Sequence, residues 1–116
     1  MSRLKLPRTL ANALLGDLQS GTGAGVVGAA SGAPRSVYPC APADFAATLA
    51  VIRSRGEAPF ACYSHAAEPD AGPVPAEIPY QILLAADTKG VILLRAFQRS
   101  EDAAAWRELD IELDHD

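Results

Sequence analysis

The segment that decides the fold spans residues 80–98 and reads YQILLAADTKGVILLRAFQ. Two apolar runs, 80–86 and 91–98, flank Asp87-Thr88-Lys89-Gly90, a compact turn with glycine at its end. Each run is apolar on both of its faces, which is typical of a strand that is covered on both sides. The segment therefore predicts a hairpin at the centre of a sheet.

Strands are predicted on both sides of this hairpin. Within the segment 106–113, Leu109, Ile111 and Leu113 alternate with Glu108, Asp110 and Glu112, and this period of two indicates a half-exposed strand at or near a sheet edge. Upstream, strands are predicted at 25–30, 35–38 and 60–65. The run 25–30 consists of small residues, and its glycines would let another element approach closely.

Two helices are also predicted. The first covers residues 7–19, where Pro7 fits a first helical turn and leucines recur at every fourth position. The second covers residues 44–54, with Asp44 in the capping position and Gly56 just beyond the end.

These elements predict one domain, 1–116, of the α/β (α+β) class. Its sheet is expected to be mixed, mostly antiparallel, with about six strands flanked by two helices. The segment 66–79 contains four prolines, which fix φ and remove backbone donors, so we expect a stiff, extended loop there.

Composition argues against two classes of partner. The formal net charge is -4 and the ten Lys and Arg residues are scattered, whereas nucleic-acid binding needs clustered cations. No apolar run approaches the ~20 residues of a membrane span, and residues 1–18 alternate charge with leucine instead of forming a signal-peptide core. We expect a cytoplasmic protein that binds neither nucleic acid nor membrane. Cys40 and Cys62 are read as buried, reduced thiols, with a single disulfide as the alternative.

Tyr63-Ser64-His65, at the end of an apolar run, looks like a metal-binding His-x-His sequence with one histidine missing. Together with segments 53–65 and 87–97 and the order of elements, it resembles the bacterial branch of the JAMM/MPN (JAB, Mov34-like) domain family over nearly the whole chain. The resemblance implies a zinc ion held by a His-Ser-His-Pro strand end and a downstream aspartate, with a glutamate as general acid/base. Members cleave isopeptide or peptide bonds after ubiquitin-like or sulfur-carrier proteins.

Most of the family's site residues have no counterpart in this chain. Thr22 stands where the general acid/base belongs, and a threonine hydroxyl does not accept a proton from metal-bound water near neutral pH. Tyr63 replaces the first histidine, Ser64 and His65 match, and Ala66 replaces the proline. A neutral phenol is a poor zinc ligand.

Two functions follow from this comparison. The preferred one is a catalytically inactive, cofactor-free JAMM/MPN-like module whose groove or sheet edge binds a protein partner, such as a ubiquitin-like or sulfur-carrier protein. The alternative is a divergent zinc-dependent isopeptidase or peptidase in which His65 and the loop carboxylates Glu68 or Asp70 hold the metal.

The roles of two residues stay open at this point. His65 is either a structural imidazole bonded to a neighbour or the remnant of a metal site. Tyr63 is either a packing residue, with its hydroxyl bonded to His65, or a residue that stacks on a ligand.

Overall fold

The computed structural model describes residues 3–20, 23–31, 33–65, 78–86, 89, 92–99 and 106–114. Within these ranges the chain forms seven strands, two α-helices and one 3-10 turn. In chain order these are β1 (Arg3–Pro7), α1 (Arg8–Ser20), β2 (Ala24–Ala30), β3 (Ala33–Pro39), the 3-10 turn (Pro42–Asp44), α2 (Phe45–Ser54), β4 (Ala58–Ser64), β5 (Tyr80–Ala86), β6 (Ile92–Arg99) and β7 (Trp106–Asp114).

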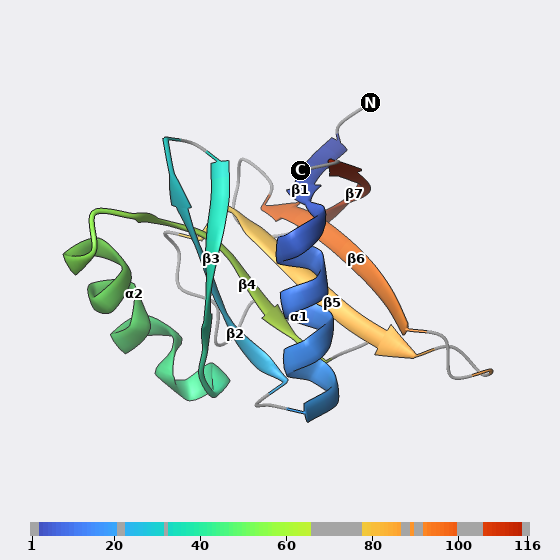
Figure 1. Cartoon of the computed structure of the whole chain (residues 1–116), viewed down its shortest axis with the longest axis horizontal. Coiled ribbons are helices and arrows are strands. Elements are labelled where there is room, and N and C mark those ends of the chain that lie inside the picture. The colour runs from blue at the N-terminus through green and yellow to red at the C-terminus, as the bar shows by residue number, and fades with distance from the viewer. Residues whose placement is uncertain are drawn as a thin grey trace.

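The strands form one mixed sheet in the order β1-β7-β6-β5-β4-β2-β3. The pairs β1–β7 and β4–β5 are parallel, and the other four pairs are antiparallel. The sheet curls around α1, which contacts both end strands, β1 and β3, as well as β7 (Figure 1). The end strands also approach each other, so the sheet is a half-barrel with α1 on its concave side.

The prediction of a sheet of about six strands flanked by two helices is wrong. The sheet has seven strands, dominates the structure and encloses one of the helices. The first helix was expected at 7–19, but α1 begins at Arg8 because Pro7 belongs to β1.

β1 is the strand that the sequence reading omitted. Leu4 and Leu6 are buried, whereas Arg3 and Lys5 are exposed, so the segment has the period of two of a half-buried strand. Its partner is β7, at the other end of the sequence, in parallel register from Arg3 opposite Asp110 onward. A five-residue strand with such a distant partner carries little local signal.

The predicted central hairpin is confirmed. β5 is the middle strand of the seven, and it pairs with β6 in antiparallel register from Tyr80 opposite Gln98 to Ala86 opposite Ile92. β7 lies next to an end strand, as predicted. Apart from Lys89, the turn 87–90 lies outside the described residues.

The second predicted helix is also confirmed. α2 begins after Asp44, which occupies the N-cap position although its side chain makes no capping hydrogen bond. Gly56 follows the helix with φ of +78°, a left-handed conformation that favours glycine, and its N–H donates to the Arg53 carbonyl.

The two faces of the sheet bury separate clusters. Neighbouring residues of one strand point to opposite faces, so Val27 and Tyr63 face α1 while Val26 and Cys62 face α2. The concave cluster consists of Leu4, Leu6, Leu10, Leu14, Val27, Ala61, Tyr63, Ile82, Leu84, Ala96 and Leu109. The convex cluster consists of Val26, Phe45, Leu49, Ile52, Cys62 and Ile78.

Two glycines of β2 allow close approach, as the sequence predicted. A Cβ on Gly25 would lie 2.5 Å from the Tyr38 carbonyl oxygen and 2.6 Å from the Tyr63 hydroxyl oxygen. A Cβ on Gly28 would lie 2.8 Å from Glu57 Oε1. At Gly25 the nearest atom belongs to the backbone, so this position needs glycine, whereas a side chain at Gly28 would require the Glu57 carboxylate to shift.

We expect Gly25→Ala to lower the free energy of unfolding by about 2–3 kcal/mol, because the new methyl group overlaps a backbone oxygen and a buried ring. Gly16→Ala is the matched control: Gly16 lies in α1, no heavy atom lies within 4 Å of the place that its Cβ would take, and alanine there should stabilise the protein by about 1 kcal/mol. Urea unfolding followed by circular dichroism measures both. Equal stability of Gly25→Ala and the unsubstituted protein would contradict the packing described above.

Candidate functional site

Tyr63 is fully buried on the concave side of the sheet. Its hydroxyl donates a hydrogen bond to Asp17 Oδ2 of α1 over 2.8 Å. Burial, and secondly the bond to Asp17, raise the pKa of this phenol well above its usual range, so the hydroxyl stays neutral. The packing role predicted for Tyr63 fits this environment, but its partner is Asp17 and not His65.

His65 follows directly after the end of β4 and is exposed. Thr22, Ala66, Glu68 and Asp70 lie outside the described residues, and so does most of the proline-rich loop. Within the described ranges no three His, Cys, Asp or Glu side chains gather into a metal-binding group. The zinc alternative therefore stays a prediction that rests on His65 and the loop.

Cys62 and Cys40 are free thiols, as predicted, but only Cys62 is buried, whereas Cys40 is half-buried. Cys62 faces the α2 side of the sheet, opposite to Tyr63, and its burial raises the pKa of the thiol to about 12. Because the thiolate is the reactive form of cysteine, Cys62 is inert as a nucleophile near neutral pH.

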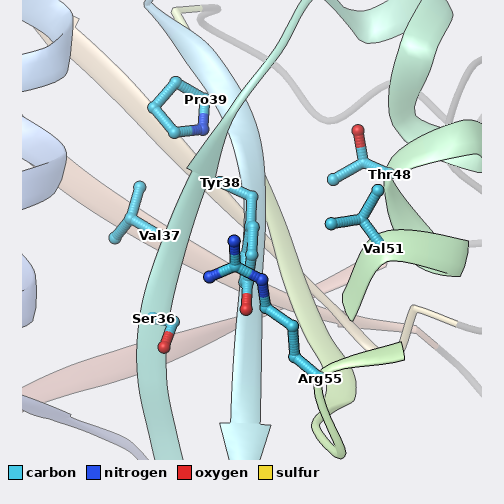
Figure 2. Close-up of a pocket in the computed structure, with 7 residues that line it drawn as sticks. All are labelled: Ser36, Val37, Tyr38, Pro39, Thr48, Val51 and Arg55. Atoms are coloured by element: carbon cyan, nitrogen blue, oxygen red, sulfur yellow. The ribbon is translucent and has the colours of Figure 1, made fainter. Parts of the chain in front are cut away.

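A groove of about 440 Å³ lies between β3 and α2, on the convex side of the sheet (Figure 2). Thr48 and Val51 of α2 and Arg55, the residue that follows the helix, project into it, at a spacing that places them on one side of the helix. The wall formed by β3 consists of Ser36, Val37, Tyr38 and Pro39.

A polar network fixes the floor of this groove. The Tyr38 hydroxyl donates to Glu57 Oε1, and the Ser36 hydroxyl donates to Glu57 Oε2 over 2.9 Å. The guanidinium carbon of Arg55 lies 5.7 Å from the centre of the Tyr38 ring, within cation–π range. Gly28 leaves the space that the Glu57 carboxylate occupies. Tyr38 and Arg55 thus form a supported platform open to solvent.

The same hydrogen bonds shift the pKa values of both titratable groups further from pH 7. The bonds from Tyr38 and then Ser36 lower the pKa of Glu57, and the bond to Glu57 raises the pKa of Tyr38. A general acid or base works best with a pKa near the operating pH. The network therefore suits recognition better than proton transfer.

Sequence reasoning did not single out this groove. One signal was present, because the glycine-containing strand 25–30 predicted a close approach without identifying Glu57 as the group that approaches. The alternation of Ser36 and Tyr38 along β3 was the other signal, since it places both hydroxyls on one face.

No family model matches this chain, and no curated protein matches it. Among solved structures, the chain is similar to the solution structure of protein DSY2949 from Desulfitobacterium hafniense, with a TM-score of 0.55 and 17% sequence identity. The likeness covers 97% of this chain and 93% of that chain. At this identity it shows a shared fold alone. Within the described residues, no helix is long and apolar enough to cross a membrane.

We expect Tyr63→Phe to lower the free energy of unfolding by about 1–2 kcal/mol, because the Asp17 carboxylate loses a donor in a half-buried position. Tyr80→Phe is the matched control, since no hydrogen bond of the Tyr80 hydroxyl occurs within the described ranges. Urea unfolding is the measurement. If both variants unfold at the same denaturant concentration as the unsubstituted protein, the bond to Asp17 does not hold α1 in place.

Proposed function

We propose that this chain is a non-catalytic protein-binding module that receives an extended segment of a partner in the groove between β3 and α2. The observation that carries the proposal is the platform of Tyr38 and Arg55 beside the exposed Val51. Tyrosine and arginine are enriched among residues that dominate binding energy at interfaces.

Val51 supplies the apolar contact of this surface. It is 46% exposed, and only Leu113 on β7 is another large apolar residue exposed within the described ranges. Val51 lies in the groove wall next to a ring whose orientation is fixed by Glu57. A rigid aromatic ring and an exposed aliphatic side chain bind a partner at little cost in conformational entropy.

The groove suits a partner segment better than the outer edge of β3 does. Pro34 and Pro39 have no N–H to donate to an added strand, and α1 contacts β3. The sequence left two binding sites open, a groove and a sheet edge. We therefore propose that the partner binds in the groove.

The absence of catalysis is part of the proposal. In the titratable pair of the groove, the pKa of Glu57 is lowered and that of Tyr38 is raised, so both lie further from neutral pH than usual. The resemblance to the JAMM/MPN family adds a partner class, the tail of a ubiquitin-like or sulfur-carrier protein, and Thr22 in place of the family's glutamate agrees with an inactive module.

We expect Val51→Asp to abolish the binding of peptides selected on this protein from a phage-displayed library of random dodecapeptides. Arg55→Ala should weaken the same peptides on the order of tenfold, the loss typical of an interface anchor. Fluorescence anisotropy of labelled peptides measures the affinities, and circular dichroism confirms that each variant is folded.

Ala50→Asp is the matched control, because Ala50 is exposed on α2 but does not line the groove. The proposal predicts unchanged affinity for this variant. If Ala50→Asp and Val51→Asp lower the affinity for the peptides equally, or if neither changes it, the peptides bind outside the groove. Titration of ubiquitin into the same variants tests the partner class. If ubiquitin does not bind while the selected peptides still bind, this partner class is wrong, but the groove remains the binding site.

The zinc alternative has a direct test in metal content. We expect untagged protein purified without chelator to contain no stoichiometric zinc, and His65→Ala to be indistinguishable from it by plasma mass spectrometry. Stoichiometric zinc that disappears in His65→Ala would instead establish the metal site and overturn the non-catalytic proposal in its simple form.

A further inference from the structure

The groove between β3 and α2 has two chemically different ends (Figure 2). At one end the Thr48 hydroxyl lies 3.2 Å from Cys40 Sγ, within hydrogen-bond distance of a partner in the protein itself. At the other end Arg55 lies over the Tyr38 ring, and Val51 stands between Thr48 and Arg55 along the helix. A segment bound along the groove therefore meets an apolar side chain in the middle and a cation at one end.

The cationic end reaches well into the groove. The Arg55 side chain extends from the end of α2 toward β3, which places its guanidinium carbon 5.7 Å from the centre of the Tyr38 ring (Figure 2). Among the described residues that line the groove, Arg55 is the only charged one. The charged group therefore lies at the surface that a partner would contact.

The hydrogen-bonding capacity of Arg55 is left for a partner. Both oxygens of the Glu57 carboxylate already accept hydroxyl donors, from Tyr38 and Ser36, and Arg55 forms no ion pair with any residue that the structure describes. A guanidinium that contacts a ring through its flat face keeps its N–H groups, which lie in its plane, for other acceptors. This end of the groove is therefore complementary to a carboxylate.

The spacing of the two contacts on α2 sets the spacing in the partner. Val51 and Arg55 are four residues apart, which corresponds to about 6 Å along a helix axis. An extended segment advances about 3.3 Å per residue and turns alternate side chains to the same side. Two residues of such a segment cover the same length, so the side chains at Val51 and at Arg55 would come from positions two apart.

We propose that the partner segment carries an aspartate or glutamate two positions from an apolar residue, with the apolar side chain on Val51 and the carboxylate on Arg55. The inference rests on the function proposed for the groove and adds to it the chemistry and spacing of the bound segment. Arginine suits this role, because its planar fork of donors matches the geometry of a carboxylate.

The experiment uses the selected dodecapeptides that Val51→Asp no longer binds, because these peptides occupy the groove. We expect them to share an acidic residue two positions from an apolar one. Replacement of that acid by the corresponding amide should weaken binding roughly fivefold in fluorescence anisotropy, the effect of losing one charge-assisted contact. Exchange of the acid with its neighbour, which turns it to the opposite side of an extended segment, should weaken binding by a similar factor.

Arg55→Gln should bind the acid and amide forms of each peptide equally. The control variant is Arg53→Gln, because Arg53 is exposed on α2 and does not line the groove, and it should keep the preference for the acid.

The inference is overturned, with the groove still the binding site, if these peptides lack the acid or if the unsubstituted protein binds acid and amide equally. The same preference in Arg55→Gln and Arg53→Gln would overturn it as well. If Val51→Asp binds every selected peptide normally, the function proposed for the groove fails, and the inference fails with it.

Discussion

The hydrogen bond from Tyr63 to Asp17 is the contact on which the rest of the concave side depends. It joins the middle of the sheet to the helix that the sheet surrounds, across a separation of 46 residues in sequence. A buried phenol without a partner is unfavourable, so the ring stays inside only while α1 is in place to accept from it. Gly25 completes the arrangement, since any side chain there would displace the ring. Helix, ring and glycine therefore depend on one another.

β2 also shapes the convex side of the sheet, because a second glycine in this strand lets another group approach closely. Gly28 admits the Glu57 carboxylate, which holds Ser36 and Tyr38 of the neighbouring strand. The orientation of the groove floor is thus set by a strand that does not line the groove. Small residues in this strand account for the shape of both sides of the sheet.

The sequence predicted the elements that have a strong local period and missed those that depend on distant partners. The 80–98 hairpin and α2 carry continuous apolar patterns, and both were confirmed. β1 was missed because its alternation spans only Arg3 to Pro7 and its partner strand lies at the other end of the sequence. The curl of the sheet follows from that same pairing and from the position of α1, neither of which a local pattern encodes.

Only part of the candidate site was predicted, because its local patterns are visible in the sequence and its distant partners are not. Alternation along a strand correctly separated Cys62 from Tyr63, and the glycines of β2 correctly indicated close approach. The partners themselves, Asp17 for Tyr63 and Glu57 for Tyr38, come from other elements, so nothing in the neighbouring sequence identifies them. The missing histidine at Tyr63 drew attention to the concave side, whereas the solvent-accessible polar network lies on the other face.

The parallel pairing of β1 with β7 has a consequence for how the protein folds. Arg3 lies opposite Asp110, so β1 has no partner until the segment that forms β7 has been synthesised. Contacts between such distant residues carry a large loop-closure entropy and slow the folding of small domains. During translation the central hairpin and α2 can form before β1 pairs with β7. The half-barrel is therefore completed last, when this end strand joins the sheet.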